Sequence, residues 1–278
     1  MQTSKQHYRV ALTIAGSDSG GGAGIQADLK TFSALGVFGT SCITALTAQN
    51  TLGVTAIEAV SPPFMRAQLE AVFSDFTPVA VKTGMLHNES IIDEVYLAVE
   101  KYAPRFLVID PVMVSTSGSL LITPAASDKL TRLLFAKATL ITPNIYEAEA
   151  LTGMKIGSET EMSKAAQWLI REAGAQAVLL KGGHLSGNRS VDILATRGSN
   201  KVSRFAKPFV NTRNTHGTGC TLSAAITAYL ALGNSLHTSV RMAKNYLHKA
   251  LEAGKNIEIG TGHGGVNHFF APKKTKLI

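Results

Sequence analysis

The sequence predicts an α/β fold in which a mostly parallel sheet lies between two layers of helices. Short β-rich runs alternate with segments of helical periodicity along the whole 278-residue chain. Most of these runs are continuously apolar, which is typical of strands buried on both faces of a sheet. A strand followed by a helix, repeated, favours a parallel sheet with helices on both sides. Since no repeat, low-complexity segment or linker interrupts the pattern, residues 1–278 are expected to form a single domain.

Eight short runs, rich in apolar and β-branched residues, are predicted to be strands. In chain order they occupy residues 8–16, 41–49, 78–84, 106–113, 139–144, 177–183, 191–196 and 204–210. In open α/β sheets, ligands bind outside the carboxyl ends of the strands. The loops that follow these runs are therefore where we expect a functional site.

Three helices are predicted most clearly by their apolar spacing. The first begins after Ser61 as N-cap, with Pro62 in the first helical position. The second covers about Asn88 to Tyr102, and the third covers residues 161–174. Their apolar faces are Met65, Leu69, Val72, Phe73 and Phe76 in the first, Ile91, Ile92, Val95 and Val99 in the second, and Met162, Ala165, Ala166 and Leu169 in the third.

The composition excludes several classes of protein. A content of 45% hydrophobic and 17% charged residues is that of an ordinary globular protein that buries a large core. Only Cys42 and Cys220 occur, with no zinc-like spacing, so we expect a reducing, cytoplasmic compartment and neither a disulfide framework nor a structural metal. No window approaches the roughly 18 apolar residues of a membrane span, and the N-terminal apolar core is too short for a secretory signal.

The net charge of +8 raises the question of a nucleic-acid partner. The 27 basic residues are scattered, however, and the only dense cluster is KKTK at residues 273–276. Such a terminal run is typical of a solvated tail rather than a polyanion-binding patch. We therefore expect small-molecule partners and neither nucleic acid nor membrane.

The first of two glycine-rich turns follows the first predicted strand. AGSDSGGGAG, residues 15–24, holds five glycines, which give backbone amides room to approach a ligand. It is not a P-loop, because Gly22 stands where that motif requires lysine. Its match to G-x-G-x-x-A is weak, because no acidic residue lies about 20 positions further on. An anion site and a plain strand-to-helix turn both stay open.

The second turn, NTHGTGC at residues 214–220, directly precedes an apolar helical stripe. At a helix N-terminus, free amides and the positive end of the dipole converge on an anion above Gly217, Thr218 and Gly219. If Cys220 lies in the first helical turn, this field and a nearby cation are expected to lower the pKa of its thiol from about 8.5 toward neutrality. The alternative for Cys220 is a small buried hydrophobe.

A resemblance to a known family rests on motifs that occur in this order: AGSDSGGGAGIQADLKTF, TALTAQNT, KTGML, DPVM, TPNIYEAEAL, KGGH and NTHGTGCTLSAA. Over roughly residues 8–270 the chain resembles the hydroxymethylpyrimidine/phosphomethylpyrimidine kinases of thiamine biosynthesis, a branch of the ribokinase family. The resemblance implies a ribokinase-like three-layer α/β/α fold and a homodimer. It also implies transfer of the ATP γ-phosphate, with Mg²⁺, to the hydroxymethyl group of 4-amino-5-hydroxymethyl-2-methylpyrimidine, and often to the resulting monophosphate.

The resemblance gives the second turn its catalytic role. It makes Cys220, where ribokinases proper have aspartate, the candidate base for the substrate alcohol. The amides of Gly217, Thr218 and Gly219 are implied to hold the transferred phosphoryl group. Because the transition state of phosphoryl transfer is loose, positioning and electrostatics should outweigh base strength.

The same resemblance implies a pyrimidine pocket. Gln49 corresponds to the family's pyrimidine reader, that is, the residue that recognises the pyrimidine by hydrogen bonds. A primary amide suits this role, since it donates to a ring nitrogen and accepts from the adjacent amino group. Gly16, Asp28 and Met85 complete the implied pocket. Taken alone, Gln49 also fits a solvated strand end, Asp28 a solvated helical acid and Met85 core packing.

Further polar residues at strand ends predict a site for MgATP. Asp110 follows a strand, and Asn144 and Glu147 form an N-x-x-E pair on the next such loop, where carboxylates suit a hydrated Mg²⁺ that bridges phosphates. We assign Asp110 and Glu147 to the metal and Asn144 to ATP, although Glu147 also fits a charge at a helix N-terminus. Lys181 is predicted to be a phosphate point charge and Asp192 a nucleotide contact.

Two other functions stay open at this point. A pyridoxal kinase of the cysteine type binds a similar flat nitrogen heterocycle with a hydroxymethyl group. A nucleotide-binding sensor keeps the fold without catalysis, but the intact GTGC, NIYE and KGGH motifs argue against it.

Four histidines are candidates for a metal cluster. His184, His216, His263 and His268 match no metal-ligand spacing. We therefore expect them to be hydrogen-bonding loop residues.

Overall fold

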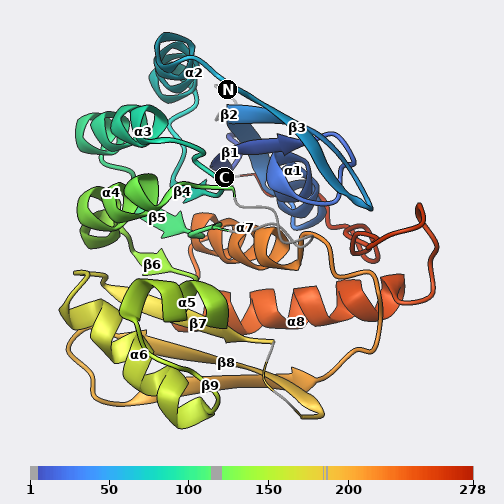
Figure 1. The fold of residues 1–278 in the computed structure, drawn as a ribbon. Coiled ribbons are helices and arrows are strands. Elements are labelled where there is room, and N and C mark those ends of the chain that lie inside the picture. Colours follow the sequence, from blue (N-terminus) through green and yellow to red (C-terminus); the bar gives the residue numbers. More distant parts are fainter. Residues whose placement is uncertain (1–5, 114–120, 184, 186, 278) are drawn as a thin grey trace, which may run out of the picture.

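The computed structural model describes residues 6–113, 121–183, 185 and 187–277, and nine strands of this part form one sheet. The strand order is β3-β2-β1-β4-β5-β6-β7-β8-β9. Neighbours from β2 to β7 are parallel, whereas β3, β8 and β9 are antiparallel to their neighbours. The strands are β1 Val10–Asp18, β2 Phe38–Asn50, β3 Gly53–Ala59, β4 Ala80–Thr83, β5 Phe106–Ile109, β6 Leu140–Ile141, β7 Ala177–Gly182, β8 Arg189–Thr196 and β9 Val202–Pro208 (Figure 1).

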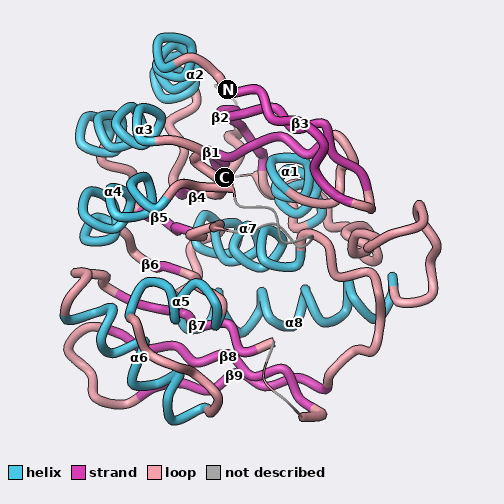
Figure 2. The backbone as a smooth tube through the Cα atoms, in the orientation of Figure 1, coloured by secondary structure: helices cyan, strands magenta, loops and turns pink. Residues whose placement is uncertain are grey.

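Helices cover both faces of this sheet, as the cyan coils of Figure 2 show. Helices α1, α7 and α8 pack with one apolar cluster, and α2 to α6 pack with the other. The predicted three-layer α/β/α architecture with a mostly parallel sheet is confirmed. The helices are α1 Gly24–Ala34, α2 Pro62–Asp75, α3 Glu89–Tyr102, α4 Pro124–Leu134, α5 Ile145–Thr152, α6 Glu159–Arg171, α7 Thr218–Ala231 and α8 Leu236–Gly254, with a 3₁₀ turn at Phe135–Lys137.

The predicted helices form close to their expected positions. Helix α2 begins at Pro62, although the Ser61 side chain makes no capping hydrogen bond. Helix α3 begins at Glu89, close to the predicted start, and the Asn88 side chain caps it by accepting from the Ile91 amide. Helix α6 begins at Glu159, earlier than predicted, because Ser158 provides its cap. None of the helices formed by the described residues is long and apolar enough to cross a membrane.

All eight predicted runs contain a strand, but the ninth, β3, was not predicted. It pairs antiparallel with β2 after a turn at residues 51–52 and is only partly buried. A search for continuously apolar runs does not detect an edge strand of this kind, because all of its residues are partly or largely exposed.

Candidate active site

A cavity of about 1040 Å³ lies at the carboxyl ends of the parallel strands. It is lined by residues from the ends of β1, β2, β4 and β7, by the loops after β5 and β6, and by the first turn of α7. This is where ligands bind in sheets of this topology. Of the predicted site residues, the following line it: Gly16, Gln49, Met85, Asp110, Asn144, Glu147, Lys181, Asp192, Gly217, Thr218, Gly219 and Cys220.

The GTGC turn lies at a helix N-terminus, as predicted. Gly217 is the N-cap of α7 with φ +76°, a left-handed conformation that favours glycine. A Cβ on Gly217 would lie 1.9 Å from the carbonyl oxygen of Gly22, so the two glycine-rich turns pack directly against each other. Of the three amides expected to hold a phosphoryl group, that of Thr218 donates to the Thr215 carbonyl at 3.2 Å.

The expected low pKa of Cys220 is wrong. Burial raises the pKa of its thiol to about 11, and the nearby carboxylates of Asp28 and Asp110 also raise it. Lys82 and the Gly24 amide act in the opposite direction without overcoming burial. The expectation counted the helix field and a cation but omitted desolvation, which opposes formation of the thiolate.

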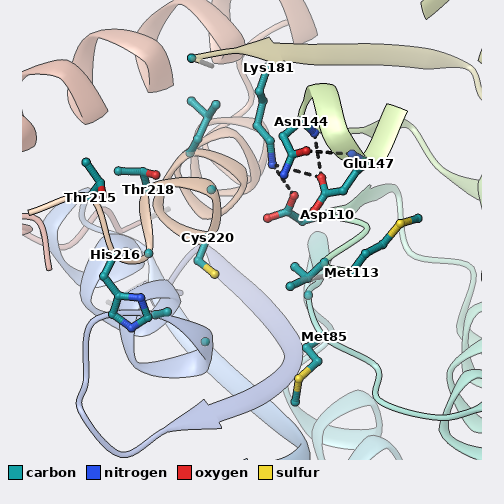
Figure 3. A pocket seen from close by; sticks show the side chains of 18 of the residues that line it. Met85, Asp110, Met113, Asn144, Glu147, Lys181, Thr215, His216, Thr218 and Cys220 are labelled. Carbon is teal, nitrogen blue, oxygen red and sulfur yellow. Dashed lines mark hydrogen bonds and ion pairs between the residues drawn. The ribbon is translucent and has the colours of Figure 1, made fainter. Parts of the chain in front are cut away.

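The two predicted metal residues, Asp110 and Glu147, converge on Lys181, as Figure 3 shows. Its Nζ lies 2.7 Å from Oδ1 of Asp110 and 4.0 Å from Oε2 of Glu147. Burial raises the pKa of Glu147 to about 7, and the nearby Asp110 carboxylate adds to this rise. The positive charge of Lys181 offsets only part of it. Lys181 and Lys82 hold the pKa of Asp110 below its ordinary value despite its burial.

Asn144 and Glu147 also cap a helix. The Asn144 side chain accepts from the Glu147 amide at 2.9 Å, and the Glu147 carboxyl accepts from the Asn144 amide at 2.7 Å. This reciprocal capping box fixes the start of α5. The N-x-x-E spacing therefore has a structural role, and it also holds a buried carboxyl at the cavity.

Asp28 differs from its expected place, because it does not line the cavity. It is fully buried on α1, where it accepts from Thr13 Oγ1 at 2.6 Å and pairs with Lys82 Nζ at 2.7 Å. Lys82, on β4, does line the cavity. Asp28 thus holds a cavity lysine in place instead of facing a ligand itself.

Three of the residues predicted to bind the pyrimidine, Gly16, Met85 and Gln49, line the cavity. A Cβ on Gly16 would lie 2.4 Å from Cε of Met85, so the methionine side chain would have to shift to admit a larger residue. Gln49 lies at the end of β2 with its amide group near His216 and Thr47. At the other end, Asp192 pairs with Lys244 at 2.7 Å.

The first glycine-rich turn uses three of its amides internally. The Asp18 carboxylate accepts from the amides of Gly20, Gly22 and Ala23 at 2.8 to 3.0 Å. It also lies 2.8 Å from Nε2 of His216. Of the two readings of this turn that the sequence left open, the structure supports an internally bonded turn.

The sequence did not single out Asp18, Lys82 or Lys244, which all line the cavity. An aspartate two residues before a glycine is typical of a side chain that bonds its own turn, and this signal was available for Asp18. Lys82 lies within the KTGML motif but was hidden in an apolar run.

Three of the four histidines form the expected loop hydrogen bonds: His216 with Asp18, His263 with the Arg213 carbonyl, and His268 with Thr221. The fourth, His184, lies outside the described residues.

Sequence comparison identifies the family. Residues 18–267 match the family described as phosphomethylpyrimidine kinase. The chain belongs to the phosphomethylpyrimidine kinase family. A relative from Rhizobium meliloti (strain 1021), named hydroxymethylpyrimidine/phosphomethylpyrimidine kinase, is 51% identical over 261 residues, which cover 94% of this chain and 97% of the relative.

Solved structures agree with membership of this kinase family. A phosphomethylpyrimidine kinase from Clostridium difficile 630 has a TM-score of 0.77 and 47% identity, covering 87% of this chain and 99% of the other. An ADP complex of Bacillus subtilis pyridoxal kinase has a TM-score of 0.86 and 34% identity, covering 94% of this chain and 98% of the other. The fold is therefore that of the ribokinase-like kinases, as the sequence motifs implied.

Proposed function

We propose that this chain transfers the γ-phosphoryl group of ATP to the hydroxymethyl group of 4-amino-5-hydroxymethyl-2-methylpyrimidine, and then to the monophosphate, in thiamine biosynthesis. The observation that carries the proposal is the GTGC turn, which lines one cavity with Gln49 near its start, through His216, and Lys181 beside Gly219. A kinase needs such an anion-binding turn between its acceptor and its donor. The names of the family and of the Rhizobium meliloti relative support this substrate.

On this proposal, α7 stabilises the transferred group. Its 14 residues direct the positive end of the helix dipole at the cavity, together with the amides of Gly217 and Gly219. The Thr218 amide joins them if it exchanges its 3.2 Å bond to Thr215 for the ligand. Cys220, in the first turn of the same helix, accepts the proton of the substrate alcohol.

The nucleotide is assigned to Asn144, Lys181 and Asp192. Lys181 supplies charge to the phosphates, and Asp192 fixes Lys244, which lines the same part of the cavity. A lysine on a strand end is a point charge suited to phosphate oxygens.

Asp110 and Glu147 are the residues that would hold Mg²⁺. They are buried carboxylates within reach of one lysine, and burial raises the pKa of Glu147 because the charge of Lys181 only partly offsets it. Among the described residues, no group of three or more His, Cys, Asp or Glu side chains is arranged to hold a metal. Two carboxylates fit a cation that takes its other ligands from phosphate and water, and Mg²⁺ bound there supplies charge neutralisation.

The pyrimidine is assigned to Gln49, Gly16 and Met85. Gln49 supplies the hydrogen bonds, Met85 an apolar wall, and Gly16 the room for both. Asp28 acts through Lys82 rather than by touching the substrate, since its side chain is fully buried.

A coupled assay for ADP release tests the proposal. Purified protein with MgATP is expected to turn over the hydroxymethylpyrimidine much faster than pyridoxine. The similarity to Bacillus subtilis pyridoxal kinase makes that activity the second candidate, and equal or inverted rates would favour it. No turnover with either substrate would favour a nucleotide-binding sensor.

The remaining expectations stay predictions. We propose one kinase domain over residues 1–278, a homodimer and a cytoplasmic location. One sheet that includes all nine described strands supports the single domain, and two free cysteines suit a reducing compartment. Light scattering of the purified protein is expected to give twice the 29.4 kDa mass of the chain.

A further inference from the structure

Asp18 links the two glycine-rich turns through a chain of hydrogen bonds that ends at Gln49. Its side chain is almost fully buried and accepts three amides of its own turn. One of its oxygens also lies 2.8 Å from Nε2 of His216, the residue before Gly217. Both His216 and Gln49 line the cavity, so the chain leads from a buried carboxylate to the proposed pyrimidine reader.

The carboxylate decides which nitrogen of His216 carries the proton. Burial acts to raise the pKa of Asp18, but the hydrogen bonds from His216 and from the Ala23 amide outweigh it and hold the pKa below its ordinary value. An ionised carboxylate only accepts hydrogen bonds, so Nε2 of His216 must donate. Because Nε2 carries this proton, it has no free lone pair and cannot accept a hydrogen bond from the Gln49 amide.

The amide group of Gln49 lies 3.3 Å from that nitrogen and 3.1 Å from Thr47 Oγ1. The two ends of a primary amide have the same shape, so its neighbours decide which end faces which. A protonated Nε2 excludes the NH₂ end of the amide as its partner and favours the amide carbonyl on its side, since the N–H that points at Asp18 can be shared only with an acceptor. Thr47 has one hydroxyl proton, which it donates to the Ser17 carbonyl at 2.8 Å, so it can accept from the amide NH₂.

Low exposure strengthens this arrangement. The His216 side chain is 12% exposed and Asp18 is 2% exposed, so water competes little for the hydrogen bond between them. Gly22 packs against the imidazole ring, where a Cβ would lie 2.5 Å from Cδ2 of His216, and this contact limits rotation of the ring.

We infer that His216, held by Asp18, is a positioning residue that fixes the Gln49 amide in one orientation and thereby selects 4-amino over 4-oxo pyrimidines. The inference rests on the proposed function, because it takes Gln49 as the pyrimidine reader. An aminopyrimidine offers a ring-nitrogen acceptor beside an amino donor, whereas the 4-oxo analogue offers an N–H donor beside a carbonyl acceptor. A glutamine that rotates freely serves both patterns, but a glutamine in a fixed orientation serves one.

The test compares kcat/KM for 4-amino-5-hydroxymethyl-2-methylpyrimidine and for its 4-oxo analogue at saturating MgATP. The wild-type protein is expected to prefer the amino compound by roughly 10²-fold, the discrimination of a site whose polar groups the wrong substrate leaves unpaired. His216→Phe is expected to reduce the preference below roughly 10-fold. The change is expected in KM for the two pyrimidines, with KM for ATP unchanged. His216→Gln, whose amide can still donate, is expected to restore part of it.

His263→Phe is the matched control, because His263 is a loop histidine bonded to the Arg213 carbonyl and is not among the cavity residues. It is expected to keep the wild-type preference. A second measurement needs no variant: nitrogen NMR of the histidine rings in the wild-type protein is expected to show the proton of His216 on Nε2.

Each failure has a distinct meaning. Wild-type protein that phosphorylates both pyrimidines equally, or a proton of His216 on Nδ1, overturns the fixed orientation and leaves the kinase function intact. An unchanged preference in His216→Phe also overturns it. Wild-type protein that phosphorylates neither pyrimidine overturns the proposed function, and the inference with it.

Discussion

Cys220→Ser tests whether the thiol takes the proton of the substrate alcohol. Burial raises the pKa of Cys220 to about 11, so at pH 8 only about one thiol in 10³ is ionised in the free enzyme. A base must be deprotonated to act, and the ionised fraction rises about tenfold per pH unit below the pKa. We therefore expect activity to increase steeply with pH if Cys220 is the base.

The assay is the pH profile of kcat/KM for the pyrimidine, which reports groups of the free enzyme. Between pH 7.5 and 9.5 the wild-type value is expected to rise about 10²-fold. Cys220→Ser is expected to give a flat profile that is at least ~10² lower at pH 9.5, with little change in KM for ATP. Cys42→Ala is the matched control, because Cys42 is the only other cysteine and lies buried in the core.

Alkylation by iodoacetamide checks the pKa independently. In the Cys42→Ala background, the rate of alkylation at Cys220 is expected to rise about tenfold per pH unit up to pH 10. If the pH dependence of this rate has its midpoint near pH 8, the raised pKa that burial gives Cys220 is contradicted. A near-normal kcat/KM for Cys220→Ser at every pH would refute the role as base, and the amides of the GTGC turn would then account for catalysis without the thiol.

Two further predictions concern packing and pH. Gly217→Ala is expected to lower the free energy of unfolding, measured in urea, by about 3 kcal/mol or more and to impair turnover, because its Cβ would meet the Gly22 carbonyl. Gly153→Ala is the matched control, because Gly153 has a similar φ of +70° but open space around it, and it is expected to cost only about 1 kcal/mol. Burial lowers the pKa of His268 to about 4. As pH falls from about 6.5 to 4, the unfolded chain therefore binds a proton at His268 that the folded chain does not bind. Urea titrations are expected to show that the free energy of unfolding falls by about 3 kcal/mol over this range, and that this fall is absent in His268→Gln.

The sequence predicted most of the fold because the elements that carry it have strong local signals. Continuous apolar runs identified every strand that is covered on both faces, and apolar spacing identified the three helices close to their observed positions. It missed β3, whose signal is weak because none of its residues is buried. The start of α6 was placed too late, because its cap at Ser158 precedes the apolar stripe.

For the site, the sequence predicted which strand ends carry polar residues but not how those residues pair. Asp28 was assigned to a ligand because its distant partner Lys82 has no signature in the local sequence. The pKa of Cys220 was placed too low because the helix field is visible in a motif, whereas burial is not. In the first glycine turn, Asp18 uses the amides that the motif appeared to leave free.

The lysines of the cavity show why the net charge revealed so little about the site. Lys82, Lys181 and Lys244 each lie 2.7 Å from a buried aspartate that comes from another part of the chain. An ATP phosphate that approaches Lys181 must therefore compete with Asp110 for the same ammonium group. When the phosphate displaces Asp110 from Lys181, the Asp110 carboxylate becomes a better ligand for a divalent ion. A divalent ion bound there in turn relieves the repulsion between the phosphate and the carboxylate. On the proposed function, nucleotide and metal should thus bind cooperatively, and the buried pair of Lys181 and Asp110 is the source of that coupling.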